Sequence, residues 1–230
     1  MRIVLVALLF VLYLVFLVPA LPLCVLLGLR EPLVTAGYWL VRLGRRILGI
    51  ELEISGLERL EPGTAYIFMS NHLSLLDGPL LMAYIGRPCR VILKKSILRV
   101  PLLGTGMRYV GFVPVDRKRA RGGMKSIALA ARLIKERGTS FLIFPEGTRS
   151  RDGKARDFRR GGFFLALESE APIVPVTIRG TFELMPKGQL YARKGTVRMT
   201  YHAPVPVEGW TRDAMDGLVA RVREEIVREG

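Results

Sequence analysis

The sequence predicts an α/β domain with a mainly parallel or mixed central sheet flanked by helices, preceded by a hydrophobic helical membrane anchor. Three observations carry this prediction: an uncharged apolar run near the N-terminus, short apolar runs after residue 50, and longer mixed segments that alternate with those runs. Alternation of this kind is typical of a sheet covered by helices on its faces. We therefore expect an anchor and interfacial region over residues 1–50 and an α/β domain over residues 51–230.

The composition indicates a folded protein with an anionic partner. Of the 230 residues, 50% are hydrophobic, and 35 Lys and Arg against 20 Asp and Glu give a formal net charge of +15. The apolar content excludes a disordered chain. The basic balance favours nucleic acid, an anionic membrane surface or a phosphorylated substrate. The two cysteines, Cys24 and Cys89, match neither a disulfide framework nor a zinc motif, which indicates a reducing compartment.

The N-terminal run covers residues 3–29, which contain no charged side chain. About 20 apolar residues suffice to cross a bilayer as a helix, and the core of a cleaved signal peptide is shorter than this run. Pro19 and Pro22 interrupt the run. Because proline kinks or ends a helix, a single kinked span and a re-entrant pair of helices are both compatible with the sequence.

The segment after this run is expected to lie at the membrane surface. Residues 38–50 combine aromatic and apolar side chains with Arg42, Arg45 and Arg46. This mixture suits an interfacial helix whose arginines reach the lipid head groups. The positive flank also indicates that this side of the membrane is cytoplasmic.

After residue 50, six short runs rich in β-branched, aromatic and other apolar residues predict strands. They cover residues 65–70, 90–95, 111–116, 140–145, 173–178 and 196–201. Three mixed segments predict helices at residues 122–138, 161–171 and 212–229. Ligands of such sheets bind beyond the carboxyl ends of the strands, so the polar residues that follow the strands are the candidate site.

The first polar cluster follows the strand at 65–70. It contains Asn71, His72 and, five positions after the histidine, Asp77. A carboxylate on one ring nitrogen of histidine fixes the tautomer and stabilises the imidazolium, while the other nitrogen accepts a proton. The spacing suits a turn in which Asp77 caps the helix that starts at Gly78. The alternative is a capped helix beside an unrelated histidine, because this spacing alone is a weak pattern.

The second cluster follows the strand at 140–145 and consists of Glu146, Gly147, Thr148 and Arg149. Gly147 lets the backbone turn tightly and expose N–H groups, and the planar guanidinium of Arg149 suits phosphate oxygens. Thr148 adds a hydroxyl donor, and Glu146 is placed to accept from a substrate hydroxyl or to hold Arg149. The alternative is a turn with a surface Glu–Arg pair.

Two further cations follow strands. Arg117 comes directly after the strand at 111–116, and Lys94 lies at the end of the strand at 90–95. Both lie where the strand-end rule places ligands, although the basic run after Arg117 is equally compatible with a solvated surface.

Three other features are assigned no chemistry. Ser74 is not part of a G-x-S-x-G motif, so it is not expected to be a nucleophile. The glycines of residues 104–111 precede a strand instead of following one, which argues against a dinucleotide-binding loop. His202 ends a strand before Ala-Pro and is expected to be structural.

Four ordered blocks link these clusters: NHLSLLD (71–77), GFVPVDR (111–117), FPEGTR (144–149) and IVPVTI (173–178). On these blocks the chain resembles the 1-acyl-sn-glycerol-3-phosphate acyltransferase (lysophosphatidic acid acyltransferase) family. The first block carries the family's H-x4-D pattern, and the resemblance spans roughly residues 50–210. One departure is Pro114, which stands where a bulky apolar residue is expected.

The resemblance implies an enzyme of phospholipid biosynthesis that moves a fatty acyl group from an acyl thioester to the sn-2 hydroxyl of 1-acyl-glycerol-3-phosphate, giving phosphatidic acid. His72 is then the general base that activates this hydroxyl, and Asp77 orients and charges the imidazole. No acyl-enzyme intermediate, metal or cofactor is implied, and acyl-CoA or acyl-carrier protein is the donor substrate. The residues implied to hold the phosphate are Arg117, Glu146, Gly147, Thr148 and Arg149, with secondary roles for Asn71, Lys94 and Pro175.

The expected partners are lysophosphatidic acid, an acyl thioester, a phospholipid membrane and acyl-carrier protein. The expected location is the cell (inner) membrane, with the active site at its cytoplasmic face. An acyltransferase for another lysolipid, such as a lyso-ornithine lipid or lysophosphatidylglycerol, is the first alternative. A membrane-anchored basic binding protein without catalysis is the second, although it leaves the strand-end clusters unexplained. Nucleic acid is not an expected partner, because the aromatic interleaving of a single-strand binder is missing.

Overall fold

The computed structural model describes residues 22–100, 103–115, 120–189 and 191–228. Over these residues the chain forms a seven-stranded sheet with the order β1-β7-β6-β2-β5-β3-β4. Neighbouring strands are parallel except for β6 and β7, which are antiparallel, so the sheet is mixed. The strands are β1 (Ile50–Ser55), β2 (Ile67–Ser70), β3 (Cys89–Lys94), β4 (Val113–Val115), β5 (Ser140–Ile143), β6 (Ile173–Arg179) and β7 (Gly195–Tyr201).

Helices connect most of these strands and cover both faces of the sheet. They are α2 (Glu31–Leu48), α3 (Asp77–Tyr84), α4 (Leu103–Tyr109), α5 (Ala120–Arg137), α6 (Gly161–Ser169), α7 (Thr181–Leu184) and α8 (Met215–Arg228). Two 3-10 turns lie at Leu57–Arg59 and Ile97–Arg99. All six expected strands and the three expected helices of the α/β domain are present, which confirms the predicted fold class. Strand β1 was not expected.

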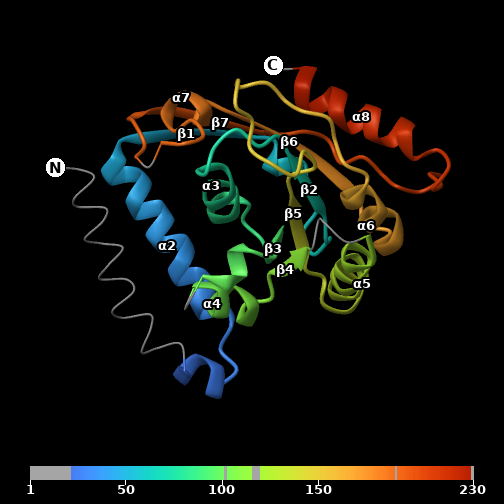
Figure 1. Ribbon diagram of the computed structural model, residues 1–230, viewed down its shortest axis with the longest axis horizontal. Coiled ribbons are helices and arrows are strands. Elements are labelled where there is room, and N and C mark those ends of the chain that lie inside the picture. Colours follow the sequence, from blue (N-terminus) through green and yellow to red (C-terminus); the bar gives the residue numbers. More distant parts are fainter. Residues whose placement is uncertain (1–21, 101–102, 116–119, 190, 229–230) are drawn as a thin grey trace.

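The sheet separates two apolar cores. Ile67 and Phe141 point toward α5, α6 and α8, while their neighbours Phe68 and Leu142 point toward α2 and α3. Successive side chains of a strand alternate between the faces, so a strand buried on both sides reads as a continuous apolar run. Figure 1 shows the two helical layers on either side of the sheet. This arrangement leaves the ends of the strands, and not their faces, available for a polar site.

Helix α2 packs on the domain through its arginines as well as its apolar side chains. Arg42 donates to the Ala83 carbonyl from Nε and Nη2, at 3.1 and 2.6 Å, and Arg45 Nε donates to the Tyr84 hydroxyl at 2.6 Å. The last carbonyls of a helix lack partners within it, and the end of α3 obtains one from Arg42. Arg42 and Arg45 thus bond within the protein, and their contact with lipid head groups stays a prediction.

Most of the expected membrane anchor, residues 3–21, lies outside the described residues. Residues 22–26 are helical, and their exposed side chains include Leu23, Val25 and Leu26. Within the described part of the chain, no helix has both the length and the apolar character needed to cross a bilayer.

The turn after β1 makes a testable demand on its glycine. Gly56 has a φ of +88°, and a Cβ added there would lie 1.9 Å from the Tyr201 carbonyl oxygen. Gly63 has a similar φ of +79° but no atom within 4 Å of the same position. We expect Gly63→Ala to lower the free energy of unfolding by about 1 kcal/mol through backbone strain, and Gly56→Ala by roughly 2–5 kcal/mol because the clash adds to it. Denaturant titration of both variants measures the difference. Equal losses of unfolding free energy in the two variants would show that β7 moves away from the new methyl group without a free-energy penalty.

Candidate active site

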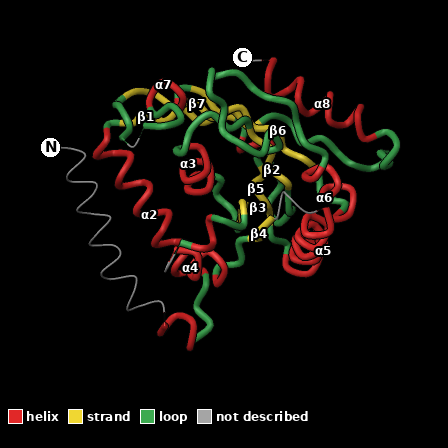
Figure 2. The backbone as a smooth tube through the Cα atoms, in the orientation of Figure 1, coloured by secondary structure: helices red, strands yellow, loops and turns green. Residues whose placement is uncertain are grey.

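Three parallel strands at the centre of the sheet deliver three loops to one edge. Strand β2 lies between β5 and β6, with Met69 opposite both Ile143 and Pro175. Residues 71–77 follow β2, residues 144–150 follow β5, and residues 180–188 follow β6. Figure 2 distinguishes these strands from the loops that continue from them. Parallel neighbours end at the same edge, so the topology brings together segments that are far apart in the sequence.

His72 and Asp77 are in direct contact at this edge. His72 Nδ1 lies 2.8 Å from Asp77 Oδ2. The Asp77 side chain is fully buried, whereas that of His72 is 21% exposed, and the imidazole stacks on the Phe144 ring with centroids 4.0 Å apart. Within the described residues, Nε2 has no hydrogen-bond partner. One ring nitrogen is thus fixed by a carboxylate, and the other is available to a ligand.

The Asp77 carboxylate also shapes the turn that carries His72. Oδ2 accepts the backbone N–H groups of Leu73 and Ser74, each at 2.7 Å. The expectation that Asp77 caps α3 is wrong, because Leu76 is the N-cap residue and Asp77 is the first residue of the helix. Its carboxylate turns back to the amides that precede the helix. The contact with His72 also excludes the alternative of an unrelated histidine.

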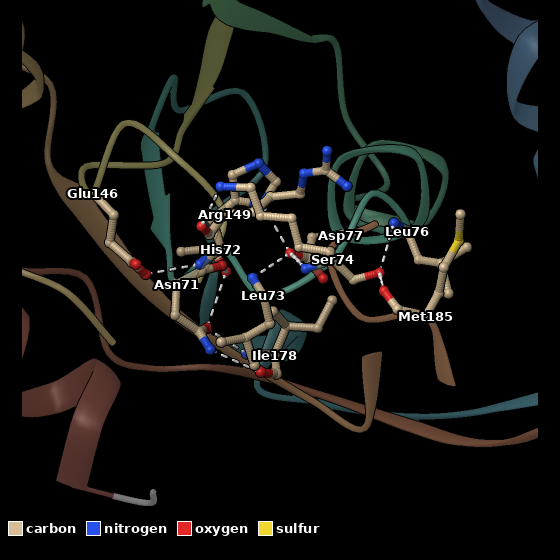
Figure 3. Close-up of polar contacts among 12 residues, drawn as sticks. Asn71, His72, Leu73, Ser74, Leu76, Asp77, Glu146, Arg149, Ile178 and Met185 are labelled. Atoms are coloured by element: carbon tan, nitrogen blue, oxygen red, sulfur yellow. Dashed lines mark hydrogen bonds and ion pairs between the residues drawn. The ribbon is translucent and has the colours of Figure 1, made fainter. Parts of the chain in front are cut away.

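Glu146 holds the backbone of the same histidine. It is 3% exposed, and its Oε1 and Oε2 accept the N–H groups of His72 at 2.8 Å and Arg156 at 3.2 Å. Burial raises the pKa of Glu146, and these two hydrogen bonds oppose the rise. The Ser150 N–H donates to the His72 carbonyl at 2.8 Å. Both backbone polar groups of His72 are therefore held by residues 146–150, and neither oxygen of Glu146 bonds Arg149 (Figure 3).

Asn71 joins the same turn to β6. Its side-chain amide donates to the Ile178 carbonyl at 2.9 Å and accepts the Ile178 N–H at 2.8 Å. Pro175 is buried within β6, opposite Met69, and belongs to the sheet and not to the group of side chains around His72. His202 follows β7, which runs antiparallel to β6, and its Nε2 lies 2.8 Å from Thr177 Oγ1. It is buried between β6 and α8, where the Thr177 hydroxyl also donates to the Ile226 carbonyl, as a structural histidine would be.

Of the residues expected to bind phosphate, the structure describes all except Arg117. Gly147 adopts a φ of +74°, and Arg159 Nε lies 3.0 Å from the place a Cβ would occupy. Arg149 is half-buried, and its guanidinium has no hydrogen-bond or ion-pair partner among the described residues. Lys94 is exposed at the end of β3, at the same edge of the sheet. Arg117 lies outside the described residues.

Two functional candidates were missed from the sequence. Ser74 was considered only as a nucleophile, but its buried hydroxyl donates to the Met185 carbonyl at 2.7 Å and accepts the Leu76 N–H at 3.2 Å. Lys187 Nζ lies 3.4 Å from both Thr148 Oγ1 and the Arg149 carbonyl oxygen. Ligands of such a sheet bind beyond the carboxyl ends of its strands, and this rule applies equally to the loop after β6. The rule could therefore have identified Lys187 from the sequence.

With this geometry established, comparison with known proteins identifies the family. Residues 51–179, more than half of the chain, match the family described as Acyltransferase. The chain belongs to that family.

Three similar proteins have closely related names. The 1-acyl-sn-glycerol-3-phosphate acyltransferase of Limnanthes douglasii is 34% identical over 182 residues, which is 79% of this chain and 64% of that protein. The 1-acyl-sn-glycerol-3-phosphate acyltransferase alpha of Homo sapiens is 30% identical over 181 residues, with the same 79% and 64% coverage. The crystal structure of the 1-acyl-sn-glycerophosphate (LPA) acyltransferase PlsC from Thermotoga maritima superposes with a TM-score of 0.81 at 26% identity, covering 100% of this chain and 96% of that chain. The match thus spans less than two thirds of the two curated relatives.

The Asp77 carboxylate offers a test that separates charge from structure. Its Oδ1 is buried and has no hydrogen-bond partner among the described residues, so Asp77→Asn can place its amide nitrogen there and keep an oxygen on the amides of Leu73 and Ser74. The fold should survive, whereas the loss of the charge should lower the rate of a reaction that uses His72 as its base by roughly 10²–10⁴-fold. Rate and melting temperature are measured together. Asp77→Ala is the comparison, because it should also destabilise the protein by about 1–3 kcal/mol for each amide left unpaired. An unchanged rate in Asp77→Asn contradicts the role of the charge.

The raised pKa of Glu146 predicts a pH dependence of stability. The pKa of Glu146 is higher in the folded protein than in the unfolded chain, where this pKa has its ordinary value of 4.5. Stability from this group is present below that pH and is lost as the pH rises through the folded-state pKa. We expect the free energy of unfolding of Glu146→Gln, relative to wild type, to improve as the pH rises above about 4.5. Exposed Glu58→Gln is the control. A difference that does not change with pH contradicts the prediction.

Proposed function

We propose that this chain is a membrane-associated 1-acylglycerol-3-phosphate O-acyltransferase, which transfers a fatty acyl group from an acyl thioester to the sn-2 hydroxyl and yields phosphatidic acid. The observation that carries the proposal is the His72–Asp77 contact of 2.8 Å, with a partly exposed imidazole, beside an Arg149 guanidinium without a partner in the described residues. The names of the similar proteins support the reaction.

The proposed chemistry is direct transfer assisted by a general base. His72 Nε2 accepts the proton of the acceptor hydroxyl, and the oxygen attacks the thioester carbonyl carbon. The new C–O ester bond forms as the C–S bond breaks, and the thiolate that leaves takes the proton back from the imidazolium. Asp77 stabilises the imidazolium while it exists and keeps the Nδ1 proton in place, so Nε2 begins each cycle as an acceptor. No covalent acyl-enzyme is formed in this scheme.

The acceptor phosphate is assigned to the loop after β5. Arg149 supplies a planar set of donors, Thr148 a hydroxyl, and the left-handed turn at Gly147 brings the backbone close. Lys94 and Arg117 are proposed to add positive charge from the neighbouring strand ends. Glu146 acts differently from our initial expectation, because both of its oxygens bond backbone amides. We assign it a positioning role for His72.

The donor is proposed to be acyl-CoA or acyl-carrier protein, with no metal or further cofactor. Membrane association is proposed to involve residues 3–29 and the outer side of α2, where the Trp39 side chain is 63% exposed. Basic residues near an anionic bilayer surface add about 1 kcal/mol each to such binding. The proposed location is the cytoplasmic face of the cell (inner) membrane, where the lysolipid acceptor lies.

The decisive experiment is a transfer assay of the purified protein in detergent. It offers lysophosphatidic acid and other lysolipids with acyl-CoA or acyl-carrier protein, and identifies the products by mass. We expect wild type to form phosphatidic acid and His72→Ala to lose roughly 10²–10⁴-fold in rate. The melting temperature should be retained, because the backbone contacts of residue 72 are unaffected.

Two outcomes of this assay contradict the proposal separately. A wild-type rate in His72→Ala refutes the general-base assignment. Absence of transfer by wild type to every lysolipid tested refutes the activity itself.

A further inference from the structure

Lys187 is joined to the candidate phosphate site by direct contacts. The chain leaves β6 at Arg179, forms the short helix α7, and reaches Lys187 three residues after that helix ends. The ammonium nitrogen lies 3.4 Å from Thr148 Oγ1 and 3.4 Å from the Arg149 carbonyl oxygen. The lysine therefore contacts the loop that carries Arg149, whose guanidinium has no partner among the described residues.

The loop that carries Lys187 is anchored to the turn of His72 and Asp77. The Met185 carbonyl accepts the Ser74 hydroxyl at 2.7 Å, and its N–H donates to the Thr181 carbonyl at 2.9 Å. Ser74 is completely buried and lies within the turn that the Asp77 carboxylate organises. Figure 3 shows this bond between Ser74 and Met185 on the side of the turn away from Glu146. The backbone two residues before Lys187 is thus anchored to the turn of His72 by a buried hydrogen bond.

Several cations lie around Lys187, and the described part of the chain provides none of them with an ion-paired carboxylate. Partial desolvation, and then the charges of Arg151, Arg149 and Arg156, lower the pKa of Lys187. Among the described residues, none of these four cations forms an ion pair with a carboxylate. The nearby carboxylate of Asp152 instead accepts from the Ser150 hydroxyl and the Lys154 N–H. Cations held together without a counter-charge favour a ligand that carries more than one negative charge.

We propose that Lys187 binds the phosphate of the acceptor together with Thr148 and Arg149, and that it selects an acceptor whose phosphate is a monoester. The inference rests on the proposed function and deepens it. A phosphate monoester carries a charge of about −1.5 to −2 at neutral pH, whereas a phosphodiester carries a single charge. An added ammonium group with three donors therefore stabilises lysophosphatidic acid more than lysophosphatidylglycerol.

A phosphate monoester also occurs in acyl-CoA, so the test must separate acceptor from donor. Lys187→Met removes the charge, and Lys187→Arg keeps it. The control is Lys154→Met, because Lys154 is an exposed lysine in the loop after β5 that forms no hydrogen bond to Thr148 or Arg149 among the described residues. Steady-state rates are measured for lysophosphatidic acid and lysophosphatidylglycerol with the same acyl chain, and separately against acyl-CoA concentration.

For Lys187→Met we expect the KM for lysophosphatidic acid to rise about tenfold while kcat stays within about twofold. The KM values for lysophosphatidylglycerol and acyl-CoA should change by less than about twofold, and Lys187→Arg should restore most of the loss. Lys154→Met should behave as wild type. A rise in the KM for acyl-CoA alone, equal rises for both lysolipids, or no rise at all would each overturn the inference.

A binding measurement keeps this inference separate from the proposed reaction. Glycerol 3-phosphate, the soluble head group, is titrated into wild type, Lys187→Met and Lys154→Met, and weaker binding is expected only for Lys187→Met. If wild type binds glycerol 3-phosphate more tightly than Lys187→Met does but transfers no acyl group, the proposed reaction is refuted and the binding site stands. If wild type transfers acyl groups but binds glycerol 3-phosphate no more tightly than Lys187→Met, the assignment of Lys187 is refuted and the reaction stands.

Discussion

The buried carboxylate of Asp77 sets the geometry on which the site depends. An ionised carboxylate without solvent is costly unless donors surround it, and Oδ2 collects three: the His72 ring and the N–H groups of Leu73 and Ser74. The same oxygen thus closes the turn and aims the imidazole, so the position of the ring does not depend on its own packing alone. Stacking on Phe144 removes the remaining freedom of the ring plane. Nε2 is consequently presented in one direction before any ligand arrives, which lowers the entropy lost in reaching a reactive arrangement.

A second carboxylate, Glu146, performs a complementary task on the backbone. It crosses from the loop after β5 to the N–H of His72, while Ser150 N–H reaches the carbonyl of the same residue. Asn71 and Ser74 make comparable bonds to Ile178 and Met185 in the segment that includes and follows β6. Three neighbouring parallel strands therefore have their ends cross-linked through residues 71–77. Glu146 and Asn71 have the residue types of substrate ligands, but in this structure their hydrogen bonds connect the three loops to one another.

The sequence was sufficient to predict the layered fold and the convergence of the clusters after β2 and β5, because both follow from periodicity and from the rule about strand ends. It was insufficient where one residue has several possible partners. Asp77 has the residue type and position of a helix cap, and only the folded turn shows that the amides before it are the nearer donors. The sequence did not predict β1. Its residues, IELEIS, alternate between apolar and polar at an edge of the sheet, and they follow a helix so directly that no break in the sequence marks the start of the strand. Lys187 escaped because its contacts with Thr148 and Arg149 cross a long separation in sequence.

The link between the proposed phosphate site and the general base accounts for the positioning of the acceptor hydroxyl in the proposed reaction. Thr148 and Arg149 precede Ser150, whose N–H is bonded to the carbonyl of His72, so the two sites share one continuous stretch of backbone. Lys187 is attached to this stretch and, through Met185 and Ser74, to the other side of the same turn. The proposed phosphate contacts and the general base therefore lie on hydrogen-bonded segments at one edge of the sheet. The acceptor has a single free hydroxyl, on the carbon next to the phosphate-bearing carbon, and binding of its phosphate by these residues would hold that hydroxyl near the base.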